Sequence, residues 1–270
     1  MSKIYQENNV QKMPMIKRVV YTAIFGDYDL LQEPKRIESN IDYICFTDNQ
    51  DVQSSKWHVV YISNDKLNNK AILNRKYKFF PHLFLKNYDQ SLYIDGNIQI
   101  QSDDINLAFD EALSEYDISI PPHPDRDCLY EEADICINLG KGVSEKIKSQ
   151  IEKYKSECYP EHNGLYENNT IFRNHNKPEI TNLMNLWYEE LKSNSGRDQL
   201  SLCYLMWKNC LKCKPFPWGG KQSHRFFKIK LHKNEMNLPL PKKICLYILI
   251  NSNVNWVYGI LSRFIKKVKK

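Results

Sequence analysis

Along most of the chain, short runs of apolar residues alternate with stretches in which apolar positions recur at helical spacing. The short runs predict strands, and the longer periodic stretches predict helices. The predicted strands cover 17–26, 41–49, 57–62, 91–100 and 116–121, and the predicted helices cover 69–85, broken at Pro81, and 105–114. This alternation predicts an α/β fold with a mixed, mostly parallel sheet and helices on both faces. Ligands of such sheets bind beyond the carboxyl ends of the strands.

The size of the chain predicts one main domain with short appendages. With 270 residues, 42% of them hydrophobic, the chain can bury one large core. Residues 1–16 are polar and are expected to be mobile, 17–241 are expected to form the main domain, and 242–270 form a basic tail.

The eight cysteines are expected to be reduced thiols, because the sequence shows no secretory signal. We therefore expect a cytoplasmic protein. Cys210 and Cys213 form a C-x-x-C pair, but a single pair lacks the second half of a structural zinc site.

The net charge of +6 comes from the tail. Residues 242–270 hold seven lysines and arginines and no acidic residue, so the rest of the chain is close to neutral. A diffuse basic groove that follows a phosphate backbone is therefore not expected, and nucleic acid is not a predicted partner.

The tail is apolar as well as basic. No residue from 244 to 262 is charged, but asparagines and a serine at 251–255 interrupt the apolar run and disfavour a membrane-spanning helix. Apolar residues then recur at helical spacing from Val254 to Val268, beside basic residues. This pattern is typical of an interfacial helix on an anionic membrane, which would place the protein at the inner face of the cell membrane. The alternative is a C-terminal helix packed on the domain.

The most informative segment is SLYIDGNIQI, in which an apolar strand is interrupted by Asp95, Gly96 and Asn97. Alternate residues of a strand face the same way, so Asp95 and Asn97 can offer two oxygen ligands to one point. Oxygen ligands of this kind suit Mg²⁺ or Mn²⁺ bound to a diphosphate. Asn97 brings no charge, which lowers the expected metal affinity or makes the metal dispensable. The alternative is that both residues simply form a turn.

Other strand ends and the helix after them offer groups suited to a nucleotide. Phe25 or Tyr28 could stack on a base, Asp48 could accept a hydrogen bond from base or ribose, and Arg75 or Lys78 could contact the diphosphate. The nucleotide-binding candidates are Thr22, Phe25, Gly26, Tyr28, Asp48, Arg75 and Lys78. Turn formation, helix capping and a solvated helix face are the alternatives.

Two later segments carry candidate groups for a ligand rich in hydroxyls, such as a sugar or a sugar acceptor. One is the irregular loop after the strand at 116–121, and the other directly precedes the apolar residues 170–172. These candidates are His123, Arg126, Tyr130, Glu131, Glu167, Asn168 and Asn169. Ordinary loop and turn roles would explain the same residues.

Asp198 and Gln199 stand at the start of a predicted helix. They could stabilise positive charge at an anomeric carbon, whereas a capping box with Ser195 would explain Asp198 without catalysis. His224 is a candidate late metal ligand, with a structural role as the alternative, and Lys221 or Arg225 could contact a diphosphate.

Seven segments in order resemble a glycosyltransferase-like family first described as a domain of unknown function. Its plant members are tied to turgor regulation and seed mucilage, and its bacterial members resemble capsule and lipopolysaccharide enzymes. The segments, which lie between residues 17 and 232, are YTAIFGDYDLL, DYICFTDN, NRKYKFFPH, SLYIDGNIQI, HPDRDCLYEEA, LYENNTIFRNH and GRDQLS.

The chain is more distantly similar to the retaining galactosyltransferase and glycogenin family, whose donor site uses a metal. Asp95 with Asn97, Asn168 with Asn169, Asp198 with Gln199, and His224 stand where that family places its donor-site residues. The departures are Asn97 in place of a second acid and the absence of Gly-x-x-Lys-Pro-Trp after His224.

These resemblances imply a GT-A fold and a glycosyltransferase that moves a sugar, with retention, from a nucleotide diphosphate donor to a surface glycan such as capsule or lipopolysaccharide. The implied nucleotide is UDP, and the implied catalytic residues are Asp95, Asp198 and Gln199. The implied metal ligands are Asp95, Asn97 and His224. Two alternatives remain, a metal-dependent hydrolase of glycan or lipid substrates and a nucleotide- or glycan-binding domain without catalysis.

Overall fold

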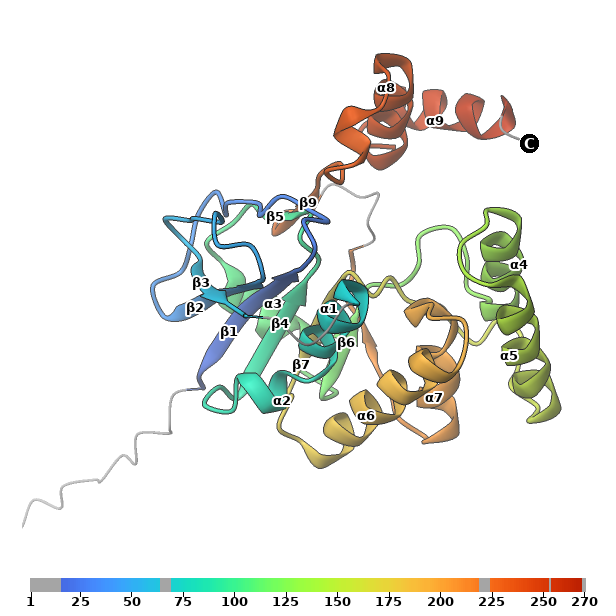
Figure 1. Cartoon of the computed structure of the whole chain (residues 1–270), viewed down its shortest axis with the longest axis horizontal. Helices are drawn as coiled ribbons and strands as arrows, with labels where there is room; N and C mark the ends of the chain where they lie inside the picture. Colours follow the sequence, from blue (N-terminus) through green and yellow to red (C-terminus); the bar gives the residue numbers. More distant parts are fainter. Residues whose placement is uncertain (1–15, 64–68, 219–223, 253, 269–270) are drawn as a thin grey trace, which may run out of the picture.

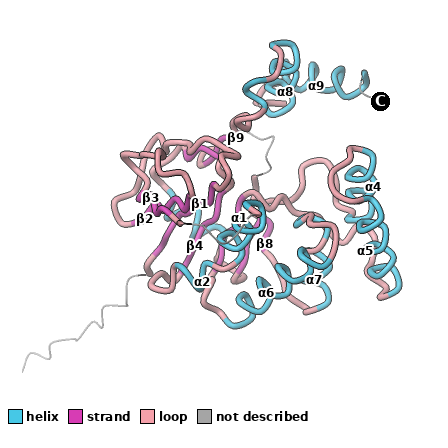
Figure 2. The backbone as a smooth tube through the Cα atoms, viewed as in Figure 1, coloured by secondary structure: helices cyan, strands magenta, loops and turns pink. Residues whose placement is uncertain are grey.

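The computed structural model describes residues 16–63, 69–218, 224–252 and 254–268. The predicted mobile N-terminal segment, except Ile16, and Lys221 lie outside these residues. The predicted α/β architecture is confirmed: a central sheet is flanked by helices in a GT-A-like arrangement (Figures 1 and 2).

The central sheet has seven strands, in the order β3-β2-β1-β4-β7-β6-β8. Neighbouring strands are parallel except at β7, which runs antiparallel to both β4 and β6. The strands of this sheet are β1 (Arg18–Ile24), β2 (Ile41–Thr47), β3 (His58–Tyr61), β4 (Gln90–Ile94), β6 (Ile118–Ile120), β7 (Thr170–Arg173) and β8 (Lys214–Pro215).

The segment 91–100 breaks at Asp95-Gly96-Asn97 as predicted, but its second half leaves the central sheet. There β5 (Ile98–Ile100) pairs antiparallel with β9 (Phe227–Ile229) in a separate two-stranded sheet. A residue near the C-terminal end of the main domain is thereby brought next to the end of β4, because Lys230 N donates to Asn97 O at 2.8 Å.

Helices cover both faces of the central sheet. The helices are α1 (Lys70–Phe79), α2 (Pro81–Phe84), α3 (Ile105–Ala112), α4 (Leu129–Asn138), α5 (Ser144–Ser156), α6 (Pro178–Ser193), α7 (Leu202–Lys208), α8 (Leu240–Ile250) and α9 (Trp256–Val268), with 3-10 turns η1 (Asp198–Leu200) and η2 (Glu235–Asn237). Helix α1 ends at Phe79, and Pro81 begins α2, which confirms the predicted break.

The core consists of two apolar layers, one on each face of the sheet. Alternate residues of β1 enter different layers: Tyr21 packs in the layer that holds Trp187 of α6, and Val20 packs in the layer that holds Phe109 of α3. A strand covered on both faces reads as a continuous apolar run, which explains the composition of β1.

Helices α8 and α9 form a hairpin that projects from the α/β body (Figure 1). Among the described residues, no helix is long and apolar enough to cross a membrane.

Candidate active site

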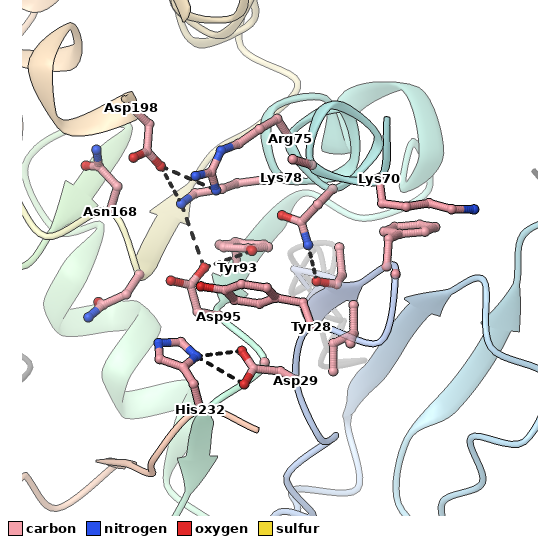
Figure 3. A pocket seen from close by; sticks show the side chains of 18 of the residues that line it. Tyr28, Asp29, Lys70, Arg75, Lys78, Tyr93, Asp95, Asn168, Asp198 and His232 are labelled. Carbon is pink, nitrogen blue, oxygen red and sulfur yellow. Dashed lines mark hydrogen bonds and ion pairs between the residues drawn. The ribbon is translucent and has the colours of Figure 1, made fainter. Parts of the chain in front are cut away.

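A cavity of about 490 Å³ opens at the carboxyl ends of β1 and β4. Its walls come from the loop after β1, one face of α1, the turn after β4, the segment before β7, the turn η1, and His232. Because β7 is antiparallel to β4, the residues before β7 lie beside those after β4, and Asp95 N donates to Asn169 O at 2.8 Å. The topology therefore gathers segments that are distant in sequence at one point (Figure 3).

The loop after β1 has a backbone shape that depends on glycine. Gly26 has φ +67°, and a Cβ there would lie 2.9 Å from Cβ of Lys70. Its amide donates to Asp48 Oδ1 at 2.9 Å, and Asp48 in turn pairs with Lys70 at 2.8 Å. Asp48 thus anchors this loop to α1 and does not line the cavity.

The two aromatic candidates in this loop differ in environment. Phe25 is buried and stacks on Tyr77, with 5.2 Å between ring centroids, whereas Tyr28 is 62% exposed at the cavity wall. Tyr28 is therefore the residue that a base can reach. Thr22 is buried below the cavity, and its hydroxyl has no hydrogen-bond partner among the described residues.

Helix α1 presents two cations to a buried carboxylate. Lys78, whose side chain is 2% exposed, places Nζ 2.9 Å from Asp198 Oδ2 and 3.8 Å from Asp95 Oδ1. An Arg75 guanidinium nitrogen lies 3.6 Å from the same Asp198 oxygen. These contacts appear as dashed lines in Figure 3. The site thus concentrates positive charge where two acidic side chains meet.

The protonation of Asp198 follows from this pairing. Burial alone raises the pKa of a carboxyl, but the charges of Arg75 and Lys78 hold the pKa of Asp198 well below its usual value. The predicted alternative of a capping box is not what this carboxylate does, because it pairs with the cations while Ser195 Oγ accepts from Arg197 N. Trp187 Nε1 fixes the turn by donating to Asp198 O at 3.0 Å. Asp198 is therefore charged at neutral pH and held in place by its backbone and side-chain contacts.

Asp95 lies at the centre of the cavity (Figure 3). Its Oδ1 accepts a hydrogen bond from Tyr93 at 2.9 Å, and its side chain is one-third exposed. Gly96 packs tightly beside it, since a Cβ there would lie 2.9 Å from the Ile24 side chain and 3.2 Å from Cβ of Asp29.

Asn168 carries the clearest sign of a missing ligand. The residue is 4% exposed and lines the cavity, yet neither its Nδ2 nor its Oδ1 has a partner within the described part of the chain. The Oδ1 of Asn169 lacks a partner in the same sense, while its Nδ2 is 3.4 Å from Glu167 Oε2. A buried amide without hydrogen bonds costs about 1–3 kcal/mol, and because both Asn168 atoms are shielded from solvent, a bound molecule would recover that energy once the side chain turns toward the cavity.

The structure adds a histidine that the sequence did not single out. His232 follows β9 and lines the cavity, with Nδ1 at 2.8 Å from Asp29 Oδ2 and Nε2 at 3.4 Å from Asn97 Nδ2. The hydrogen bond to Asp29 raises the pKa of His232 above its ordinary value. Asp29 and His232 are 203 residues apart, so no local pattern could have joined them.

The three predicted metal ligands are not brought together. Only Asp95 lines the cavity; Asn97 is buried and donates from Nδ2 to Lys230 O, and His224 packs against Phe216, Trp218 and Phe227. Burial lowers the pKa of His224. Within the described ranges, no three His, Cys, Asp or Glu residues lie close enough together to hold a metal ion. Cys210 and Cys213 are therefore not part of such a group among these residues.

The other predicted residues divide between the cavity and other parts of the domain. Gln199 lines the cavity, as do Glu167 and Arg197. His123, Arg126, Tyr130 and Glu131 do not: Arg126 pairs with Glu132, and the Tyr130 hydroxyl donates to Tyr159 O at 2.6 Å. Arg225 pairs with Glu111, away from the cavity.

The cavity lies largely within a segment of the chain that matches a known protein family. A family model described as TOD1/MUCI70, glycosyltransferase-like domain, matches residues 3–217. The matched range contains the cavity-lining residues discussed above except His232, and it ends before α8 and α9. No curated protein matches the chain.

Proposed function

Because the chain belongs to the TOD1/MUCI70 glycosyltransferase-like domain family, we propose that it transfers a sugar from a nucleotide diphosphate donor, UDP in the first instance, to a surface glycan such as capsule or lipopolysaccharide. The observation that carries this proposal is one cavity in which Arg75, Lys78, Asp95 and Asp198 meet beside the unpartnered amide of Asn168. Cations for a diphosphate and a polar, unsatisfied wall for a sugar are the two parts that a nucleotide-sugar site needs.

Arg75 and Lys78 bind the diphosphate in this proposal. Loss of the nucleotide diphosphate places negative charge on the leaving oxygen, and fixed cations beside it lower the barrier without reorganising at the moment of reaction. Tyr28, the exposed aromatic residue at the cavity wall, stacks on the base.

Asn168 and Asn169 bind the hydroxyls of the donor sugar. An amide donates through Nδ2 and accepts through Oδ1, so a single sugar hydroxyl or a vicinal pair satisfies both groups. Glu167 stands next to them at the cavity wall.

Asp198 and Gln199 act near the anomeric carbon. The depressed pKa of Asp198 makes it a poor general base but a constant negative charge, which stabilises the positive charge that develops as the glycosidic bond breaks. This electrostatic role favours transfer with retention. If transfer inverts the configuration, Glu167 is the better placed general base.

A divalent ion is part of this proposal, with Asp95 and His232, which both line the cavity, as its candidate protein ligands in place of His224. Mg²⁺ and Mn²⁺ at such sites take one or two protein ligands and complete their coordination with phosphate oxygens and water. Asp95 supplies a carboxylate oxygen, and Asp29 holds the His232 ring through Nδ1, as carboxylates commonly do for metal-bound histidines. The ion would supply further positive charge for the diphosphate, with Asp95 and His232 holding it and Asn97 adjacent.

Calorimetric titration with UDP, GDP and CMP, each with and without Mn²⁺, tests the donor site. We expect UDP to bind selectively and more tightly with Mn²⁺, and we expect the Mn²⁺ effect to disappear in both Asp95→Ala and His232→Ala but to persist in His224→Ala. Incubation with a panel of UDP-sugars then separates the reactions: acceptor-dependent release of UDP supports transfer, and release that no acceptor stimulates would support a hydrolase. Binding of no nucleotide would overturn the proposal.

A further inference from the structure

The hairpin of α8 and α9 has an exposure pattern opposite to that of a water-soluble helical pair. Among its described residues, the buried ones are polar, Asn251 and Ser262. Their side chains bond to the hairpin's own backbone: Asn251 Nδ2 donates to Tyr247 O, and Ser262 Oγ donates to Gly259 O. The polar residues thus form the inside of the hairpin.

The apolar residues of α9 form a stripe that faces solvent. Positions i, i+3, i+4 and i+7 share one face of a helix, and in a globular protein an apolar stripe at this spacing faces the core. In α9 these positions are Val257, Ile260, Leu261 and Phe264, and all four are exposed, Phe264 at 62%. At the start of the same helix, Trp256 is 76% exposed.

Helix α8 repeats the pattern. Leu240, Ile244 and Tyr247 lie on one face at i, i+4 and i+7 and are exposed, and no residue of this apolar helix is buried. Figure 1 shows both helices projecting from the α/β body, and the side that carries Tyr247, Ile250 and Tyr258 faces β9. Exposed apolar faces on both helices of one hairpin mark an interaction site, since scattered single residues do not produce this pattern.

The charges of the hairpin identify what covers it. From residue 240 to the end of the chain there are seven basic residues and no acidic one. In the described part of α9, Arg263, Lys266 and Lys267 are exposed next to the apolar stripe. A membrane with anionic lipids offers both the apolar layer and the negative headgroups that such a surface requires. A second copy of the hairpin would match the apolar residues but would bring like charges together.

We propose that α8 and α9 form a membrane-docking surface for an anionic phospholipid bilayer, with Trp256, Phe264 and their neighbours in the headgroup–acyl boundary. The hairpin is fixed to the donor cavity, because a short segment joins His232 to α8 and Lys266 pairs with Asp125 of the body at 3.1 Å. Docking would therefore hold the cavity at a set height above the lipid surface.

Flotation of the full chain with vesicles tests this proposal. We expect binding to phosphatidylcholine vesicles that contain phosphatidylglycerol, weaker binding to phosphatidylcholine alone, and loss of the difference in high salt. The double variant Trp256→Ser with Phe264→Ser should lower the partition coefficient at least tenfold, because two large apolar side chains no longer insert. Leu139→Ser, which changes an exposed apolar residue at the end of α4, is the matched control and should bind as the wild type does.

A second pair of variants tests the charges. Arg263→Gln with Lys267→Gln should lower binding to the anionic vesicles about fivefold for each charge removed, with little change on neutral vesicles. Lys146→Gln with Lys148→Gln, on the exposed face of α5, is the control of equal charge. The proposal is overturned if the chain binds to none of the vesicles. It is also overturned if sedimentation without lipid shows that the wild type is a dimer and that the double variant Trp256→Ser with Phe264→Ser is a monomer.

Discussion

The cavity at the strand ends and the C-terminal hairpin depart from the usual distribution of residues in opposite directions. In the cavity, charged and polar groups are buried: Lys78 and Asp198 pair in the interior, and Asn168 is buried without a partner among the described residues. In the hairpin, large apolar groups such as Trp256 and Phe264 are exposed. Each departure costs free energy in the isolated chain, which is why we propose that a ligand completes the first surface and a lipid the second.

The largest effect is expected where a buried charge loses its partner. Asp198→Ala leaves Lys78 and Arg75 without their shared carboxylate, and breaking a buried pair of this kind costs about 3–5 kcal/mol of unfolding free energy. Urea unfolding measures this change. Glu189→Ala, which removes an exposed i,i+3 pair with Lys192, should cost less than about 1 kcal/mol. Equal costs for the two variants would contradict the assigned role of the Asp198 pair.

The pH dependence of this pair has a definite sign. Because the folded-state pKa of Asp198 is depressed, its contribution to stability is present above the ordinary aspartate pKa of about 3.9 and is lost as the pH falls towards the folded pKa. The difference in unfolding free energy between wild type and Asp198→Ala should therefore be constant from about pH 5 to about pH 8 and should become smaller at lower pH. A difference that grows on acidification would refute the charge assignment.

A smaller effect, on catalysis more than on stability, is expected at Asn168. Asn168→Ala removes a group with no partner in the described chain, so it should leave the unfolding free energy nearly unchanged while lowering kcat/KM for the sugar donor by about 10- to 100-fold. The affinity for UDP, which has no sugar, should stay the same. An equal loss of UDP affinity would place Asn168 at the nucleotide instead.

The contribution of the His232 and Asp29 pair to stability should depend on pH in the direction opposite to that of Asp198. The pKa of His232 is raised by Asp29, so its charged form stabilises the fold below the ordinary histidine pKa of about 6.5, and that stability is lost as the pH rises through the folded value. His232→Gln should therefore destabilise the protein more at acidic than at alkaline pH, as followed by thermal unfolding. A pH-independent difference would show that the imidazole charge has no role.

The smallest effect on stability is expected in the hairpin. Trp256→Ala should change the unfolding free energy by no more than about 0.5 kcal/mol, because this side chain is exposed. The buried Trp187→Ala should cost about 3–5 kcal/mol. If both substitutions destabilise equally, the hairpin packs on the body in solution and the comparison between the two regions fails.

The sequence predicted the fold because its strands and helices have clear local patterns. Strand runs such as 41–49 contain Ile, Tyr or Phe at four of nine positions, and Pro81 interrupts helical hydrogen bonding whatever the tertiary packing. The break after β4 was predicted from Asp95, Gly96 and Asn97, but its consequence was not: β5 pairs with β9, a strand formed from residues more than a hundred positions later. Pairings between such distant segments leave no local pattern.

The same limit explains the site. Arg75, Lys78 and Asp95 were predicted because they follow strands or lie on one helix face, and the structure brings them to one cavity. His224 was chosen because it stands where the galactosyltransferase and glycogenin family places its late histidine, yet in the structure its ring packs against Trp218 and Phe227. His232 reaches the cavity through the β5–β9 pairing, which only the fold reveals.

The central claim is that the cations of α1 bind a diphosphate in this cavity. Calorimetric titration of Arg75→Gln with UDP and with uridine tests it most directly, with Lys76→Gln, a lysine of the same helix that does not line the cavity, as the matched control. We predict that Arg75→Gln weakens UDP binding by about tenfold or more, because a charge-assisted hydrogen bond is lost, and leaves uridine binding unchanged, while Lys76→Gln has a smaller effect. UDP affinity that is the same in wild type and Arg75→Gln would contradict the claim.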